Sequence, residues 1–148
     1  MDHRSSSRET PAARRILVVD GHPLMRRGLA ALIGHEPDLT VCATAATPRA
    51  ALAAVAASRP DLVVIDLSLA DGEGLALVRH IRSDHADLPV LVLSLHDAPF
   101  HAQRALRAGA RGYIPKPELS ETLLIAIRCL LRGETFLSPT MRSRLDAG

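Results

Sequence analysis

Aromatic side chains are scarce in this sequence: two Phe, one Tyr and no Trp make up 2% of its 148 residues. Proteins that bind single-stranded nucleic acids or carbohydrates stack their ligands on aromatic rings, so this composition argues against both classes. Long apolar runs are missing as well, and none approaches the roughly 18 residues of a membrane span. The polar N-terminus has no apolar segment of the kind found in secretory signals. We therefore expect a cytoplasmic protein without a membrane partner.

Cysteine and one-sided charge are also limited. The two cysteines, Cys42 and Cys129, lie in apolar stretches, which favours buried, reduced thiols. The formal net charge is only +2, far from the dense basic surface of a nucleic-acid-binding domain. Lys116 is the single lysine among 18 basic residues, and its flexible ammonium differs chemically from the planar arginine fork. This contrast makes Lys116 a candidate functional residue.

Short apolar segments alternate with stretches of helical periodicity along the chain. The predicted strands are Ile16–Asp20, Leu39–Ala43, Leu62–Asp66, Val90–Ser94 and Gly112–Ile114. Three of them (ILVVD, LVVID and VLVLS) are continuously apolar until their last residue, which is typical of parallel strands covered on both faces. Five β-then-α units predict an α/β fold, a parallel sheet with helices on both faces and right-handed crossovers.

Polar residues follow several of these strands where they end. In open parallel sheets the functional site lies at the carboxyl ends of the strands, which here carry Asp20, Asp66, Ser94 and Lys116. A carboxylate can attack phosphorus and become an acyl phosphate, and Mg²⁺ can neutralise the phosphoryl oxygens. The ammonium and the hydroxyl can pair with further phosphoryl oxygens. The sequence contains neither a P-loop nor a dinucleotide-binding glycine motif.

The segments ILVVDGHPLMRRGL, RPDLVVIDLSLADGEGL, LPVLVLSLHD and GARGYIPKP resemble the receiver domain of bacterial two-component response regulators, most of all the NarL/LuxR type. The match is collinear over roughly residues 14–140. It implies a doubly wound, flavodoxin-like (βα)5 fold with strand order 2-1-3-4-5. We expect a disordered tail at 1–13, a receiver domain at 14–133, and at 134–148 the start of a linker to a helix-turn-helix output domain absent from this chain.

The resemblance also implies roles for single residues. They are Asp66 as phosphoacceptor, Asp20, Asp66 and the Ser68 backbone carbonyl as Mg²⁺ ligands, Ser94 and Lys116 as phosphoryl-binding groups, and Ser94 with Tyr113 as switch residues. One position departs from the family, because Gly21 stands where the second acid of an Asp-Asp pair ligates the metal. The Mg²⁺ site is therefore expected to be weakened.

The resemblance predicts a signalling module rather than an enzyme. It would accept phosphate from a sensor histidine kinase, form a homodimer, and control transcription by binding DNA through the absent domain only. Phe100, Ile125 and Cys129 are the predicted partner surface, since each falls outside the apolar stripe of its helix. One alternative is a degenerate receiver that works by phosphorylation-independent dimerisation or protein binding. An aspartyl-phosphate phosphohydrolase ranks behind both, because Ser68 stands where such enzymes need a second Asp.

Overall fold

The computed structural model describes residues 12–67, 73–95 and 99–147 of the chain. Most of the predicted N-terminal tail lies outside these residues. Within the described ranges, six parallel strands form one sheet in the order β2-β1-β3-β4-β5-β6. They are β1 (Arg14–Val19), β2 (Leu39–Ala45), β3 (Leu62–Asp66), β4 (Val90–Ser94), β5 (Gly112–Pro115) and β6 (Phe136–Leu137). The predicted order of the first five strands is confirmed, and β6 extends the sheet beside β5.

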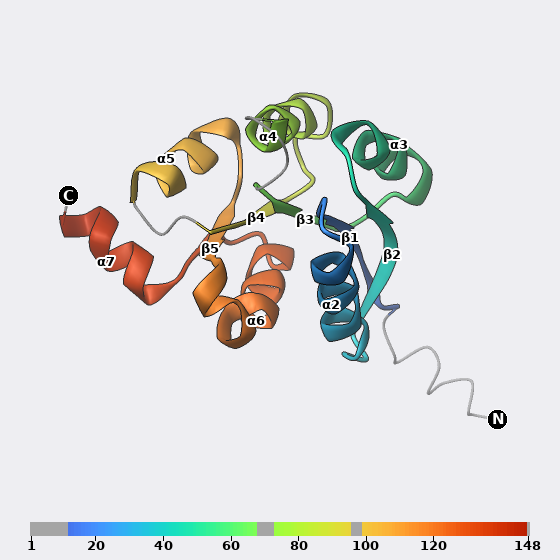
Figure 1. Cartoon of the computed structure of the whole chain (residues 1–148), viewed down its shortest axis with the longest axis horizontal. Helices are drawn as coiled ribbons and strands as arrows, with labels where there is room; N and C mark the ends of the chain where they lie inside the picture. The colour runs from blue at the N-terminus through green and yellow to red at the C-terminus, as the bar shows by residue number, and fades with distance from the viewer. Residues whose placement is uncertain (1–11, 68–72, 96–98, 148) are drawn as a thin grey trace.

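Helices cover both faces of this sheet (Figure 1). One face carries α2 (Pro23–Gly34) and α6 (Leu119–Leu131), and a short 3₁₀ turn, η2 (Lys116–Glu118), precedes α6. The other face carries α3 (Pro48–Ser58), α4 (Glu73–Asp84) and α5 (Pro99–Ala108). A last helix, α7 (Pro139–Ala147), packs against α5. The chain therefore has the predicted flavodoxin-like α/β architecture.

Local sequence accounts for several of these boundaries. Pro23 and Pro48 occupy the first turn of α2 and α3, where a missing backbone N–H costs nothing. The hydroxyl of Thr47 accepts a hydrogen bond from the Ala50 backbone N–H at 3.1 Å and caps α3. At the other end, Arg59 adopts a left-handed conformation with φ of 48° and stops the helix.

The core consists of two apolar layers, one on each side of the sheet. Successive strand residues point to opposite faces. Thus Ile16 and Val18 pack into the layer below α2 and α6, whereas Leu17 and Val19 pack into the layer below α3, α4 and α5. Because both faces are covered, all four side chains are fully buried. This double burial explains the continuous apolar runs in the sequence.

Residues after Gly133 fold back onto the domain. Strand β6 pairs with β5, and the buried hydroxyl of Ser138 accepts a hydrogen bond from the Met141 backbone N–H at 3.2 Å as α7 begins. Met141 is only 1% exposed and belongs to the layer below α3, α4 and α5. The end of the receiver at residue 133 and the following linker stay predictions. In the described ranges, no helix is long and apolar enough to cross a membrane.

Candidate functional site

Two aspartates lie side by side at the carboxyl edge of the sheet. Asp66 is the last residue of β3, and Asp20 directly follows β1, the neighbouring strand. Both side chains are fully buried. Burial raises the pKa of Asp20 above its usual range, and the nearby Asp66 charge raises it further, while the His22 backbone N–H bond acts in the opposite direction.

Lys116 completes the carboxylate pair. Its Nζ donates a hydrogen bond to Oδ2 of Asp66 at 2.8 Å, and its side chain is only 11% exposed. The lysine comes immediately after β5 and is the first residue of the turn η2. The structure thus brings together Asp20, Asp66 and the single lysine of the chain, as their positions after parallel strands predict.

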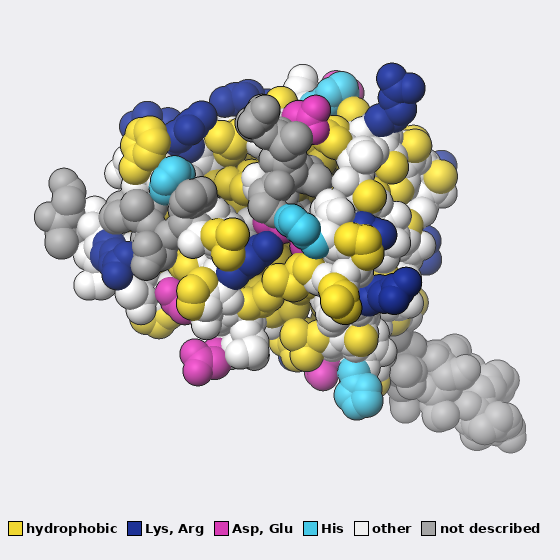
Figure 2. Space-filling view, in the orientation of Figure 1, with side chains coloured by type: hydrophobic (Ala, Val, Ile, Leu, Met, Phe, Trp, Pro, Cys, Tyr) yellow, Lys and Arg dark blue, Asp and Glu magenta, His cyan; other side chains and the backbone are white. Residues whose placement is uncertain are grey.

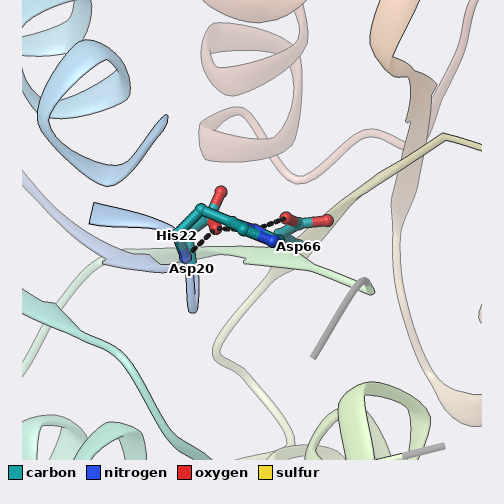
Figure 3. Close-up of side chains that lie close together, drawn as sticks. All are labelled: Asp20, His22 and Asp66. Atoms are coloured by element: carbon teal, nitrogen blue, oxygen red, sulfur yellow. Dashed lines mark hydrogen bonds and ion pairs between the residues drawn. The ribbon is translucent and has the colours of Figure 1, made fainter. Parts of the chain in front are cut away.

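His22 also joins this site, although the sequence pattern does not identify it. Its Nδ1 lies 3.3 Å from Oδ1 of Asp20 and 3.9 Å from Oδ2 of Asp66. Figure 3 shows the imidazole between the two carboxylates. A ligand atom from each of these three residues falls within 4.8 Å of the others, a spacing that suits a metal ion. The sequence feature that could have identified His22 is its position two residues after Asp20, the aspartate that follows β1.

Acidic, histidine and basic side chains meet near the centre of the face seen in Figure 2. Oδ2 of Asp20 is buried there and has no hydrogen-bond partner among the described residues. A buried, unpaired carboxylate oxygen is unfavourable unless a cation or a donor reaches it. The donor set of two carboxylates therefore fits a divalent cation such as Mg²⁺, and Gly21 adds no side-chain ligand.

The remaining predicted site residues are Ser94, Tyr113 and Ser68. Ser94 ends β4, the strand beside Asp66, and is 1% exposed. Tyr113 is fully buried in β5, within the apolar layer below α5. The backbone carbonyl of Ser68 lies outside the described residues. Their roles as phosphoryl-binding, switch and metal-binding groups remain predictions.

The predicted partner surface divides into exposed and buried members. Phe100 on α5 is 60% exposed and Ile125 on α6 is 59% exposed. Cys129 is only 9% exposed, because the chain after α6 folds over it. Its thiol lies 3.2 Å from the Thr135 carbonyl and 3.4 Å from a Glu134 carboxylate oxygen. Burial raises the pKa of this thiol. The prediction that Cys129 lies on an exposed face of the helix is therefore corrected.

A groove lies at the opposite edge of the sheet. An open groove of about 720 Å³ is lined by residues near the starts of strands, including Arg14, Asp61, Pro89 and Arg111. Two of its basic side chains already have partners, since Arg14 pairs with Asp61 and Arg111 donates to the Ala86 carbonyl. The carboxyl edge, with its buried charges, is the better candidate for chemistry.

Comparison with known proteins shows the family of the chain. The sequence profile of the response regulator receiver domain matches residues 16–128. The oxygen regulatory protein NreC of Staphylococcus epidermidis is 33% identical over 132 residues, which cover 88% of this chain and 61% of NreC. The transcriptional regulatory protein UhpA of Salmonella typhimurium is 35% identical over 133 residues, covering 90% of this chain and 66% of UhpA.

A solved structure shows the same relationship. The chain superimposes on a LuxR-family two-component response regulator from Aurantimonas sp. SI85-9A1 with a TM-score of 0.87 and 33% sequence identity. The match covers 92% of this chain and 97% of the other. The chain therefore belongs to the response regulator receiver domain family. Within that family it is of the LuxR type, and its relatives NreC and UhpA are an oxygen regulatory protein and a transcriptional regulatory protein.

Proposed function

We propose that this receiver accepts a phosphoryl group from a sensor histidine kinase on Asp66. The observation that carries the proposal is the buried Asp66 carboxylate, held at 2.8 Å by the Lys116 ammonium and flanked by Asp20. A buried carboxylate that has a cationic partner and stands at the carboxyl edge of a parallel sheet is positioned for nucleophilic chemistry. The family assignment supports the same role.

The transfer exchanges one bond to phosphorus for another. A carboxylate oxygen of Asp66 attacks the phosphorus, and the P–N bond to the kinase histidine breaks. The imidazole nitrogen keeps the bonding pair and leaves as neutral imidazole after taking up a proton. Lys116 stays beside the new acyl phosphate and pairs with a phosphoryl oxygen. Ser94, at the end of the adjacent strand, supplies the hydroxyl that the resemblance assigns to this step.

The residues present fit a divalent cation at this edge. Asp20 and Asp66 would hold it, with the Ser68 carbonyl as the further ligand that the resemblance implies. Mg²⁺ bound there supplies positive charge against the phosphoryl oxygens. Asp20 accepts the His22 backbone N–H on Oδ1 at 2.8 Å, which leaves Oδ2 as the oxygen available to a cation.

The relatives support a proposal for the role of the whole protein. NreC and UhpA are named as regulatory proteins, and this chain spans 61% and 66% of their lengths. We infer that phosphorylation changes dimerisation of this receiver and so regulates transcription in the cytoplasm, with DNA bound by an output domain. A phosphoryl group does this by biasing an existing conformational equilibrium, in which Ser94 and Tyr113 would take part. The exposed Ile125 and Phe100 mark the surfaces for such a change.

Gly21 favours a second candidate, a degenerate receiver that works without phosphorylation. A glycine supplies no side-chain oxygen beside Asp20 and Asp66. The cation therefore has one carboxylate ligand fewer than in a receiver with an Asp-Asp pair. Restoring the carboxylate with Gly21→Asp should raise the Mg²⁺ affinity of the chain, as measured by isothermal titration calorimetry. An unchanged affinity would count against this placement of the metal site.

Intact-mass spectrometry tests the proposed function directly. The chain is incubated with acetyl phosphate, with and without Mg²⁺, beside an Asp66→Asn variant. Asp87→Asn is the matched control, because this aspartate is exposed and lies at the opposite end of the fold. We expect one added phosphoryl group in the wild type and the control, only with Mg²⁺, and none in Asp66→Asn.

The alternative outcome selects the degenerate receiver. If the folded wild type gains no mass from acetyl phosphate, the same experiment is repeated with a phosphorylated sensor kinase as donor. Failure of both donors would overturn phosphorylation as the working step. A mass gain that survives Asp66→Asn would place the phosphoryl group on another residue.

A further inference from the structure

The carboxyl edge contains a nitrogen ligand as well as carboxylates. His22 Nδ1 and oxygens of Asp20 and Asp66 lie within 4.8 Å of one another. Asp66 ends β3, Asp20 directly follows the adjacent strand β1, and His22 is the residue before α2. Figure 3 shows the imidazole turned towards both carboxylates. This cluster lies in the receiver site, so the inference rests on the proposed function. The affinity of the cluster for different metal ions can be measured without any phosphoryl transfer.

The orphaned oxygen of Asp20 indicates that the cluster is a ligand site. Its Oδ1 accepts the His22 backbone N–H, whereas its Oδ2 is buried and has no partner among the described residues. Arg26 does not fill this role, since its guanidinium donates to the Asp20 backbone carbonyl at 2.8 Å. A buried carboxylate oxygen in this state is stabilised by a cation placed between Asp20 and its neighbours.

The backbone around position 21 determines which third ligand is present. Gly21 offers no side chain, so the next group along the chain is the imidazole of His22. The His22 side chain is 63% exposed. Its ring can therefore reorient towards an ion without displacing core residues. The turn that positions it is held by the 2.8 Å bond between its own N–H and Asp20.

The chemistry of this donor set differs from that of an all-oxygen site. Mg²⁺ prefers oxygen ligands and releases water reluctantly, whereas imidazole suits first-row transition metals. Protein sites for such metals commonly combine imidazole with carboxylate ligands. We propose that Asp20, Asp66 and His22 bind a divalent transition-metal ion, with His22 Nδ1 as a direct ligand, in preference to Mg²⁺.

Titration of the untagged chain with two ions tests this proposal. Co²⁺ and Mg²⁺ are the probes, and isothermal titration calorimetry measures their affinities for the wild type, His22→Ala and His35→Ala. His35 is the matched control, because it is an exposed histidine at the other end of α2. We expect His22→Ala to weaken Co²⁺ binding by about 10-fold or more while leaving Mg²⁺ binding unchanged. His35→Ala should change neither affinity.

The contrast between the two ions is essential, because nitrogen and oxygen sites generally bind Co²⁺ more tightly than Mg²⁺. An equal loss for both ions in His22→Ala would show that the residue acts through the turn at Asp20, and would overturn the nitrogen ligand. No loss for either ion would do the same.

Electron spin-echo spectroscopy of the wild type with bound Mn²⁺ provides a test without a variant. Modulation from an imidazole nitrogen is expected, and its absence would overturn the proposal. Neither measurement depends on phosphorylation of Asp66. A receiver that fails to gain mass can still show the nitrogen ligand, and one without the nitrogen ligand can still be phosphorylated.

Discussion

At the scale of single residues, Asp20 is in an unfavourable environment for a charged group. Its buried carboxylate has a raised pKa, which means that the charged form destabilises the folded state at neutral pH. Asp20→Asn keeps the acceptor for the His22 N–H and replaces the orphaned oxygen by an amide donor. We expect this variant to gain about 1 kcal/mol in the free energy of unfolding, as measured by urea denaturation.

Urea denaturation with added metal ions links the stability of the Asp20 variant to metal binding. A ligand that binds only the folded state raises its stability, so added Mg²⁺ or Co²⁺ should stabilise the wild type. Asp20→Asn should lose most of that gain. Asp87→Asn, on an exposed aspartate, should shift the stability by less than about 0.5 kcal/mol and keep the full metal effect. A less stable Asp20→Asn chain would show that the buried charge of Asp20 does not destabilise the fold.

The sequence predicted part of this site because strand topology alone brings Asp20, Asp66 and Lys116 to one edge. The position of His22 was missed for a physical reason. Its role depends on the orientation of an exposed ring after a turn, which no apolar periodicity records. Helical periodicity predicts an exposed Cys129, because it does not record the segment after α6 that covers the thiol. From the sequence, that segment is interpreted as a linker.

At the scale of elements, the contact between β3 and α4 depends on a glycine. A Cβ on Gly74 would lie 2.8 Å from Cδ2 and 3.1 Å from the backbone Cα of Leu67. The end of the Leu67 side chain can turn away, but its backbone Cα and α4 must separate by a few tenths of an ångström to accept the new Cβ of Gly74→Ala. We expect a loss of about 1–3 kcal/mol in the free energy of unfolding.

Gly28 in α2 is the matched control for this prediction. A Cβ there meets nothing within 4 Å, and alanine favours the helix over glycine. Gly28→Ala should therefore stabilise the chain by about 0.5–1 kcal/mol. Opposite signs for the two substitutions in urea denaturation would support the packing argument, whereas the same sign would contradict it.

An ion-pair network ties α6 to the connection between α2 and β2. Arg128 binds Asp38 through Nε at 2.9 Å and Nη2 at 2.8 Å, and Glu36 through Nη2 at 2.7 Å. The Arg128 guanidinium lowers the pKa of Asp38 from its ordinary value of 3.8. A lowered carboxyl pKa contributes stability that is complete above the ordinary value and is lost as pH falls through the folded-state value.

This network predicts how a variant depends on pH. Arg128→Gln should be less stable than the wild type at neutral pH, and the difference should shrink as pH falls below 3.8. Urea denaturation at several pH values measures this. Arg132→Gln is the control, because Arg132 pairs only with Glu134 two residues away among its described contacts. Its effect should be small at every pH. If the stability difference between Arg128→Gln and the wild type persisted below pH 3.8, the role of Asp38 would be contradicted.

The last two elements show where sequence reasoning reached its limit. Strand β6 has two residues, too few for any periodicity, and it forms only because β5 offers a free edge. The start of α7 did carry a signal, since Ser138 before Pro139 is a typical helix beginning. The burial of Met141 could not be foreseen, because it depends on the position of α5 relative to the sheet.

At the scale of the whole molecule, large apolar side chains are exposed on both sides of the sheet among the described residues. Leu24 and Leu32 on α2 and Ile125 on α6 lie on one side. Phe100 on α5 lies on the other side, and the exposed Leu95 follows β4. Phe100 already contacts its own helix, since the Arg104 guanidinium lies 5.6 Å from its ring centre.

Because Phe100 already contacts Arg104, we expect the dimer to form on the side of α2 and α6, where Ile125 is 59% exposed. Ile125→Glu should shift the chain towards monomer in analytical ultracentrifugation, whereas Phe100→Glu should leave the distribution unchanged. Each glutamate sits on an exposed position, so neither variant should lose its fold. The two variants are compared before and after treatment with acetyl phosphate, because we propose that phosphorylation changes dimerisation. A monomeric wild type under both conditions would contradict the dimer, and loss of the dimer in Phe100→Glu alone would move it to the α5 side of the sheet.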